Sequence, residues 1–388
     1  MAIGRLRAAI IVMVLAQHAM VAYFPFARVP QPTLAAEPRT WLAFPIVDPS
    51  RSTGVMVLMT FNDIFGMALM FLLSGLFVSI SLVGKGSRRY LRDRAIRLGI
   101  PFLAAATVLT PIAYYPSYLV TTGSPSFAEF LRQWFAMGFW PGGAGPAWFL
   151  WVLLAFDTIA AVLLTSMPET RRSMLRRVAA GASQRPMTFW RWLVIASAIA
   201  YLPLALIAGA GTWDQLGPFK LQTSRVLHYL VYFLAGVAIG DLDVQRGLLA
   251  ETGWLTRRWA AWLGAALTAF GVFCGFVLAA YASDRPMLTW DIGAALLFVV
   301  SCATSSFAVL AVFIRFGRAM TTLLDASIPN AYGIYLVHYM VVTWLQYALL
   351  STSWPGIAKA WIVFLGAVAC SWGVTAGLRS IPAVRRVL

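Results

Sequence analysis

Charged residues are scarce in this sequence. Of its 388 residues only 11% are Asp, Glu, Lys or Arg, whereas 60% are hydrophobic. A soluble domain carries roughly 25% charged residues, so the composition excludes an ordinary soluble globular protein. Long apolar stretches follow one another along the whole chain, which is typical of a polytopic membrane protein.

Acidic residues are rarer still, with 14 Asp and Glu against 30 Lys and Arg, which gives a net charge of +16. Such an excess could indicate nucleic-acid binding, but membrane proteins also keep Lys and Arg in their cytoplasmic loops. When successive loops are assigned alternately to the two sides, 22 of the 30 basic residues fall on one side. This asymmetry predicts that both termini are cytoplasmic, and it accounts for the charge with no nucleic-acid partner. The basic segments are 1–7, 85–97, 171–191, 246–258, 315–318 and 379–388.

Cysteine is scarce as well. Cys274, Cys302 and Cys370 are the only three, they lie in apolar runs, and no C-x-x-C spacing occurs. An odd number without paired spacing indicates neither a disulfide framework nor a zinc site. We therefore expect buried packing residues here and no metal centre.

The apolar stretches predict an all-α fold, a polytopic membrane helical bundle of about ten transmembrane helices. A span needs roughly 20 mostly apolar residues. We expect one membrane-embedded domain over 1–388 with no separate soluble domain, and a first helix that is retained rather than cleaved as a signal peptide. Residues 26–54 and 122–145 form long outer loops. The predicted spans are 4–25, 55–83, 99–121, 146–167, 190–211, 226–242, 259–281, 290–314, 329–350 and 358–379.

A histidine interrupts the first span. His18 lies eleven residues after Arg7, which is roughly 16 Å along a helix and only ~20° off whole turns. One helix face thus offers a permanent cation at the cytoplasmic rim and a proton-exchanging imidazole at half-depth. The plainer interpretation is a histidine that is hydrogen-bonded within the bundle, with Arg7 a topology signal.

Arginines are concentrated before the third span. The segment KGSRRYLRDRAIRLGIP, residues 85–101, holds six basic residues, and Arg94 and Arg97 share an i,i+3 face of the predicted helix. Arginine forks suit phosphate oxygens, so this segment could hold a phosphorylated substrate arriving from the cytoplasm. A topology signal or contact with lipid headgroups is the alternative.

Other polar residues lie inside predicted spans, where ionisable groups are costly and often functional. His338 is about nine residues into the ninth span, at a depth similar to that of His18, with Tyr335 one turn before it. Asp157 is at mid-depth and Asp63 lies in the outer part of the second span. Each carboxylate could orient a histidine, bind a hydroxyl group from the outside, or pack helices together.

Two further residues of interest, Trp148 and His228, lie at the ends of predicted spans. Trp148 begins the fourth span, and it is predicted to bind an outside substrate together with Asp63 and Tyr335. His228 follows Arg225 at the outer end of the sixth span. From this position we expect an interfacial side chain within reach of water.

Taken in order, six segments resemble the membrane-bound acyltransferase-3 family, the integral-membrane O-acyltransferases of cell-envelope glycans. The resemblance implies ten helices in the inner (plasma) membrane. It implies transfer of an acyl group from cytoplasmic acyl-CoA, as acetyl-CoA or succinyl-CoA, to an extracytoplasmic glycan, with no permanently bound cofactor. The segments are LRAAIIVMVLAQHA (6–19), MFLLSGLF (70–77), RDRAIRLGIPF (92–102), GPAWFLWVLLAFD (145–157), YFLAGVAIG (232–240) and NAYGIYLVHYMV (330–341).

The family's functional arginine and histidine of the first span fall on Arg7 and His18, and its Arg-x-x-Arg element falls on Arg94 and Arg97. The residues and the resemblance together predict that these arginines hold the phosphates of the donor and that His18 acts as a general base, with transient acylation of His18 as the alternative. His338 and Asp157 are further catalytic candidates that could orient His18 or the acceptor. The long first outer loop and the FLLSGLF segment loosely resemble the branch of periplasmic-glucan succinyltransferases. The family's usual histidine before Trp-Phe-Leu is replaced by Pro146-Ala147. A transporter or flippase without bond chemistry, or a scaffold subunit, is the alternative class, because intramembrane His and Asp also serve proton relays.

Overall fold

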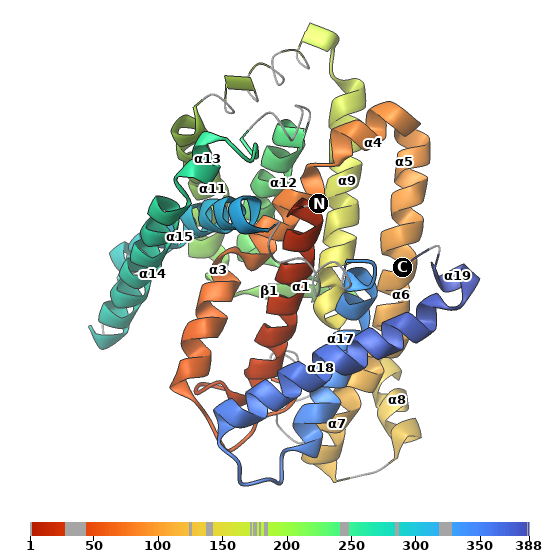
Figure 1. Cartoon of the computed structure of the whole chain (residues 1–388). Coiled ribbons are helices and arrows are strands. Elements are labelled where there is room, and N and C mark those ends of the chain that lie inside the picture. Colours follow the sequence, from red (N-terminus) through yellow and green to blue (C-terminus); the bar gives the residue numbers. More distant parts are fainter. Residues whose placement is uncertain are drawn as a thin grey trace.

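A computed structural model describes residues 2–27, 44–123, 126–136, 143–170, 173, 177, 180–181, 185–240, 248–283, 287–317, 328–385 and 387. Most of the outer loop 26–54, and residues 124–125 and 137–142 of the outer loop 122–145, lie outside these described residues, as does most of the basic segment 171–184. Within the described part the chain is a bundle of long helices (Figure 1).

Each of the ten predicted spans is helical. Mostly apolar residues run for the length that a bilayer crossing requires, although Pro116 and Pro203 lie inside two of the helices. Nine helical segments are long and apolar enough to cross a membrane among the described residues. The chain is therefore a multi-pass integral membrane protein. The main helices are α1 (Ala2–Met20), α3 (Thr53–Gly75), α4 (Val78–Lys85), α5 (Ser87–Arg94), α6 (Ile100–Ala104), α7 (Thr110–Thr122), α9 (Trp148–Ser166), α11 (Pro186–Ala208), α12 (Val226–Gly240), α14 (Trp259–Ala282), α15 (Leu288–Phe316), α17 (Ala331–Ala348) and α18 (Gly356–Arg379).

The predicted span that is not among these nine is the ninth along the chain, α17, which is less apolar than the others. It packs against α1, α7 and α18. In Figure 1 it runs alongside α1 through the lower half of the bundle. The polar side chains of α17 lower its hydropathy. The bundle tolerates them because several contact buried partners rather than lipid. The cytoplasmic location of both termini stays a prediction.

The third span is an unusually long helix with two irregular turns. π-helical turns at Ala95–Gly99 and Ala105–Leu109 interrupt the path from α5 through α6 to α7. Such turns occur frequently at functional sites. The first of them contains Arg97, so it changes the direction of that side chain relative to Arg94.

Glycines allow two helices to approach closely at the centre of the bundle. A Cβ atom on Gly236 would lie 2.0 Å from the carbonyl oxygen of Leu72, and one on Gly75 would lie 2.1 Å from that of Phe233. Small residues at helix interfaces bring backbones together in this way. Gly75 and Gly236 therefore bring α3 and α12 into close contact.

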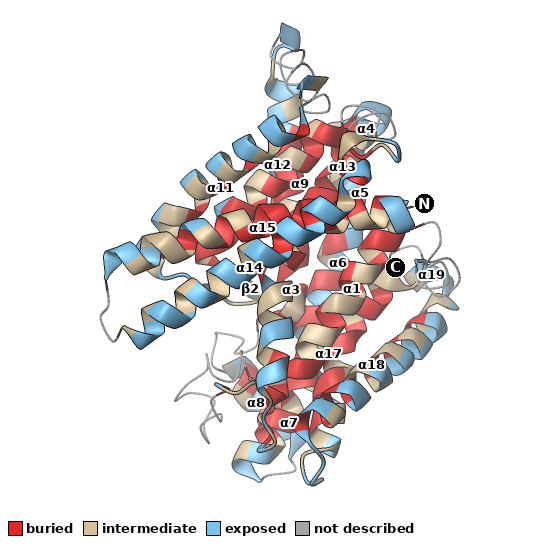
Figure 2. Ribbon diagram, turned by 60° about the vertical axis from the view of Figure 1, so that its left-hand side comes forward, coloured by how far each residue is buried: buried red, intermediate tan, exposed pale blue. Residues whose placement is uncertain are grey.

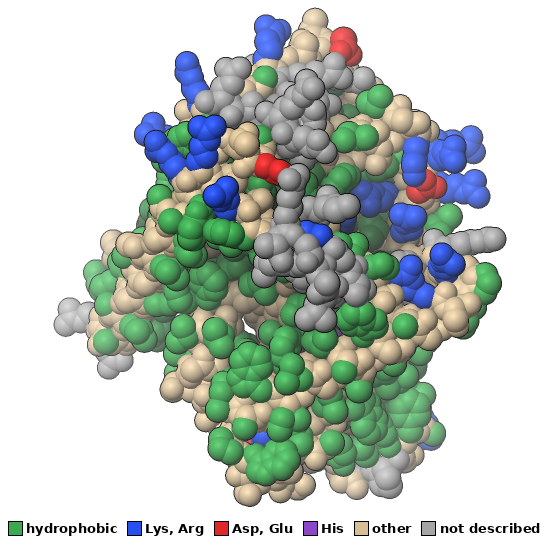
Figure 3. All heavy atoms as spheres, in the orientation of Figure 1, with side chains coloured by type: hydrophobic (Ala, Val, Ile, Leu, Met, Phe, Trp, Pro, Cys, Tyr) green, Lys and Arg blue, Asp and Glu red, His purple; other side chains and the backbone are tan. Residues whose placement is uncertain are grey.

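Burial separates the inner helices from the outer ones. Figure 2 shows buried residues along α1, α9, α12, α15 and α17, whereas α14 and α18 are largely exposed on one side. The exposed side chains of the outer helices are mostly apolar, which suits contact with lipid. Lys and Arg side chains gather at the end of the bundle that carries α4 and α5 (Figure 3). We call this end the basic face.

A buried ion pair stabilises the end of the bundle opposite the basic face. Lys359 Nζ lies 2.8 Å from Asp48 Oδ2 and 3.0 Å from Oδ1, and each side chain is only 1% exposed. The backbone NH of Asp48 also donates to the carbonyl of Ala22. The start of α18 and the end of the first outer loop are therefore locked to the end of α1.

One element was not foreseen from the sequence. Strands β1 (Trp213–Leu216) and β2 (Phe219–Gln222) form an antiparallel hairpin between α11 and α12. The two-residue connection places Gly217, with φ +57°, at the first central position, as a type II′ turn requires. The Gly217-Pro218 dipeptide was the available signal for this turn.

Candidate active site

Two histidines from distant parts of the chain form a hydrogen-bonded pair. His338 Nε2 lies 3.0 Å from His18 Nδ1, and the ring centroids are 5.0 Å apart. His338 is completely buried, whereas His18 is partly accessible. The matching depths expected for these two residues correspond to direct contact in the structure.

The backbone fixes the protons in this pair. His338 Nδ1 lies 2.6 Å from the carbonyl oxygen of Tyr335, which can only accept, so Nδ1 carries the hydrogen. In the neutral ring Nε2 is then an acceptor, and His18 must donate to it from Nδ1. His18 Nε2 is left with a lone pair. The arrangement orients one histidine and leaves its second nitrogen able to take a proton.

Further side chains hold α1 in place around His18. Gln346 donates from Nε2 to the carbonyl of His18 at 2.9 Å. Asn62 donates from Nδ2 to Gln17 Oε1 at 2.6 Å and to the carbonyl of Met13 at 3.1 Å. The ring of Tyr339 meets that of His18 edge-on, with centroids 5.1 Å apart. The sequence analysis missed Gln346, Asn62 and Tyr339, although Gln346 follows His338 by eight residues and so shares its helix face.

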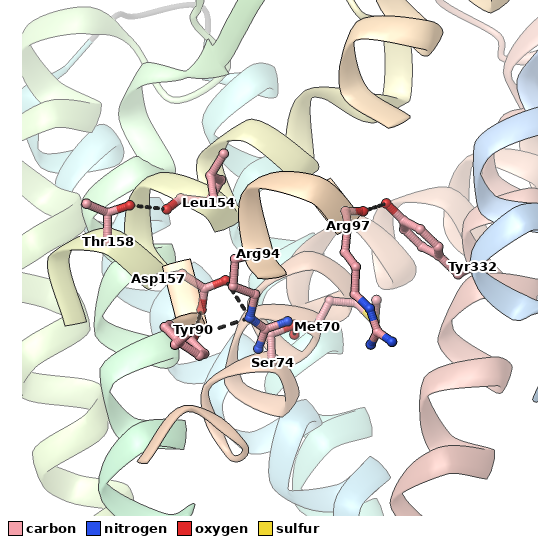
Figure 4. A network of polar contacts seen from close by, with 9 residues as sticks. All are labelled: Met70, Ser74, Tyr90, Arg94, Arg97, Leu154, Asp157, Thr158 and Tyr332. Atoms are coloured by element: carbon pink, nitrogen blue, oxygen red, sulfur yellow. Dashed lines mark hydrogen bonds and ion pairs between the residues drawn. The ribbon is translucent and has the colours of Figure 1, made fainter. Parts of the chain in front are cut away.

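The predicted arginines gather toward the basic face. Arg94 Nε lies 3.2 Å from Asp157 Oδ2 and donates to Tyr90 OH at 3.3 Å. Tyr90 OH in turn donates to Asp157 Oδ1 at 2.6 Å, so one carboxylate anchors both side chains (Figure 4). Arg7 is partly buried, stacks over Phe77, and lies within electrostatic range of Arg94.

Arg97 points away from this carboxylate. Its guanidinium is exposed, while its backbone carbonyl accepts a hydrogen bond from Tyr332 OH at 2.5 Å (Figure 4). The i,i+3 spacing predicted a shared face with Arg94. That prediction is only partly right, because the π-helical turn separates the two directions. Three guanidinium groups, on Arg7, Arg94 and Arg97, thus accompany one carboxylate, and positive charge is in excess.

Asp157 belongs to the arginine group rather than to the histidine pair. Its side chain is completely buried against Tyr90 and Arg94. The depth of Asp157 could be predicted from its position in the span, but its partner could not. In this position the carboxylate holds Arg94 in one orientation.

Helix α17 connects the two groups. Tyr332 reaches Arg97, Tyr335 OH donates to the carbonyl of Pro146, and His338 contacts His18. From Tyr332 to His338 the helix rises roughly 9 Å. The arginine group and the histidine pair are therefore positioned by one rigid element.

Two other predicted residues lie elsewhere. Asp63 Oδ2 pairs with Arg225 Nη2 at 2.8 Å, and this pair joins α3 to the beginning of α12. Trp148 packs among aromatic rings, including Phe71 at 6.3 Å and Trp213 of the hairpin at 5.2 Å between centroids. A direct role of either residue in acceptor binding stays a prediction.

The prediction for His228 is wrong. Its side chain is completely buried and its Nε2 lies 3.4 Å from Cys302 Sγ, with Tyr232 and Phe298 beside the ring. Sequence position gives the depth of a residue on a helix, but not the face that its neighbours cover. Here the face of α12 that carries His228 packs against α11 and α15.

The chain also matches a known protein family. The model of a family described as an acyltransferase domain matches residues 2–376, nearly the whole chain. The chain belongs to the membrane acyltransferase-3 family. In comparisons with curated proteins and with solved structures, nothing matches this chain.

Family membership makes this membrane protein an acyltransferase, and it favours the enzyme over the transporter alternative. The histidine pair and the arginine group lie within the matched segment. Among the described residues, no group of three or more His, Cys, Asp or Glu could hold a metal ion.

Proposed function

We propose that this acyltransferase takes its acyl group from cytoplasmic acyl-CoA and transfers it to a hydroxyl of an extracytoplasmic glycan, in the inner membrane, with His18 as the general base. The observation that supports this most strongly is the oriented His18–His338 pair. Its free nitrogen is suited to accept a proton, and one helix connects the pair to an excess of arginine.

The donor assignment rests on charge. Coenzyme A carries several phosphate groups, and arginine forks bind phosphate oxygens in a bidentate manner. Asp157 and Tyr90 use the Nε side of Arg94, and Arg97 is exposed at the same end of the bundle. Arg7 lies ~16 Å from His18 along α1. The phosphates would bind near the arginines, and the long pantetheine arm would carry the thioester toward His18.

The base assignment rests on hydrogen bonding. A hydroxyl near His18 Nε2 would give up its proton to that nitrogen as its oxygen attacks the thioester carbon. The resulting imidazolium would still donate from Nδ1 to His338, whose ring is fixed by the carbonyl of Tyr335. An acyl group carried transiently on His18 itself is the second route.

A labelling experiment tests donor and base together. Purified protein in lipid nanodiscs receives acetyl-CoA or succinyl-CoA labelled in the acyl group, with envelope glycan as acceptor. We expect wild-type protein to move label to the glycan, and His18→Ala to lower kcat by about 10²–10⁴-fold. Unchanged transfer by His18→Ala would refute the base, and intact donor without any transfer by wild-type protein would refute the donor. Acyl-His18 detected by mass spectrometry would select the covalent route.

A matched pair of variants tests the phosphate site. Arg97→Ala removes an exposed guanidinium beside the proposed donor path, and Arg92→Ala removes an exposed one on α5. We expect Arg97→Ala to raise the KM for acyl-CoA roughly tenfold, which corresponds to about 1.4 kcal/mol, with kcat nearly unchanged. Arg92→Ala should change KM less than twofold. Equal effects of the two variants on the KM for acyl-CoA would show that Arg97 acts only through general surface charge and not in a specific phosphate site.

A further inference from the structure

The β-hairpin is a fixed wall of the bundle rather than a free outer loop. Trp151 of α9 donates from Nε1 to the carbonyl of Lys220 at 2.9 Å, and Phe219 stacks on Phe102 of α6 with centroids 5.4 Å apart. In Figure 1 strand β1 lies at the height of the middle of α1. The hairpin is held against the inner helices by its contacts with α6 and α9.

Lys220 carries a positive charge on this hairpin. Its Nζ lies 4.7 Å from the ring centroid of Trp213 on the paired strand. The charge acts electrostatically on the imidazole of His18, although the two residues are 202 positions apart. Arg7 does not supply a positive charge close to the imidazole, because it lies ~16 Å from His18 along α1.

The loop before α9 joins Lys220 to the histidine pair. Gly143 lies against the side chain of Lys220, with 3.3 Å between the Lys220 Cβ and the position of a Cβ on Gly143. Gly145, two residues later, lies against Tyr339, whose ring edge meets His18. Both glycines have positive φ, +53° and +52°, which lets the backbone pass closely between the hairpin and α17.

No carboxylate compensates this lysine among the contacts of the described residues. In the hairpin register Lys220 faces Gln215, whereas Asp214 faces Leu221 and therefore points to the other side of the sheet. Asp214 accepts a hydrogen bond from Thr223. Burial lowers the pKa of Lys220 to about 8, as expected for a cation that is desolvated without a counter-ion. Such a group is arranged to meet negative charge that arrives with a substrate or develops in a reaction.

We propose that Lys220 binds the oxyanion that forms on the acyl carbonyl during transfer, as a further catalytic residue. The proposal rests on the proposed function. The acceptor hydroxyl oxygen bonds to the thioester carbon, its proton passes to His18 Nε2, and the carbonyl electron pair moves onto oxygen beside the Lys220 ammonium. The electron pair then returns, the C–S bond breaks, and the thiolate leaves and takes the proton from His18. A preorganised cation in a water-poor site stabilises such a charge strongly.

Two variants at this position separate charge from shape. Lys220→Met keeps the length of the side chain and removes the charge, and Lys220→Arg keeps the charge. For Lys220→Met we expect a loss of kcat of about 10²–10³-fold, the effect of losing one oxyanion donor, with an unchanged KM for acyl-CoA. Lys220→Arg should retain a rate within about tenfold of wild type. Thermal unfolding of each variant is measured as the check that the fold is intact.

The donor used in the assay distinguishes two anions. If Lys220 binds the oxyanion, Lys220→Met loses the same factor with acetyl-CoA and with succinyl-CoA, because both form the same oxyanion. A loss with succinyl-CoA alone would show that the lysine binds the carboxylate of the acyl group, and this overturns the proposal. Equal rates of wild-type protein and Lys220→Met also overturn it, while the donor and base assignments stand.

The pH profile gives an independent test. Among the described residues, the charge of Lys220 is within electrostatic range of His18 on α1, and Asp214 lies on the other face of the hairpin. Since Lys220 has a pKa of about 8, it is charged below that pH, and kcat of wild-type protein should fall as pH rises through 8. Lys220→Arg should move this fall to a higher pH, because guanidinium stays protonated. A fall at the same pH in both proteins would exclude Lys220 as its source.

Discussion

Replacing His338 changes only the acceptor that orients His18. In the wild-type protein His18 Nδ1 donates to His338 Nε2 at 3.0 Å, which keeps the lone pair on His18 Nε2. His338→Phe removes the acceptor and keeps an aromatic ring in a completely buried position. The Nδ1 proton then loses this acceptor, and the backbone of Val14 is the remaining hydrogen-bond partner of the ring. A larger share of the His18 rings should therefore carry the proton on Nε2, and such a ring cannot take a proton there.

The size of the effect follows from what is lost. A correctly placed proton acceptor contributes about 10²–10⁴-fold in rate, or roughly 3–5 kcal/mol of transition-state stabilisation. His338→Gln offers an oxygen to His18 Nδ1, so it should stay within about tenfold of wild type. Neither change touches the arginine group, and the KM for acyl-CoA should remain the same in both.

The assay is steady-state acyl transfer by purified protein in nanodiscs, with kcat and KM measured separately and thermal unfolding as the check on folding. The expected order of kcat is wild type, His338→Gln, then His338→Phe. A well-folded His338→Phe protein with wild-type kcat would refute the reasoning, because it would show that His18 needs no acceptor at Nδ1. A changed KM with unchanged kcat would place His338 in substrate binding instead.

Two further predictions concern stability. Lys359→Met leaves the carboxylate of Asp48 buried and unpaired, and should cost roughly 3–5 kcal/mol in unfolding free energy; adding Asp48→Leu should restore most of it, and a double variant no more stable than the single one would contradict the pairing. Gly236→Ala would place a Cβ 2.0 Å from the carbonyl oxygen of Leu72, so the yield of folded protein should fall sharply, whereas Gly264→Ala, with open space around it, should be neutral or up to about 1 kcal/mol more stable. Equal effects of the two alanines in unfolding experiments would argue against close packing of α3 on α12.

The sequence by itself determined the membrane class, the all-α bundle and the positions of the helices. These follow from runs of apolar residues about as long as a bilayer is thick, which is a local property of the chain. Sequence also selected Arg7, His18, Arg94, Arg97 and His338, because ionisable groups within or beside apolar helices are costly and therefore informative. The resemblance that named the family depended on the same segments.

Tertiary structure alone decided which of these residues meet. Depth along a helix can be counted, but the face that a neighbour covers depends on how helices pack. His338 therefore proved to be the partner of His18, Asp157 the partner of Arg94, and His228 a buried side chain. In the sequence Lys220 could be used only as one of the basic residues that are counted to assign topology. Its place near His18 depends on a hairpin held by α6 and α9, a contact between segments far apart in the chain.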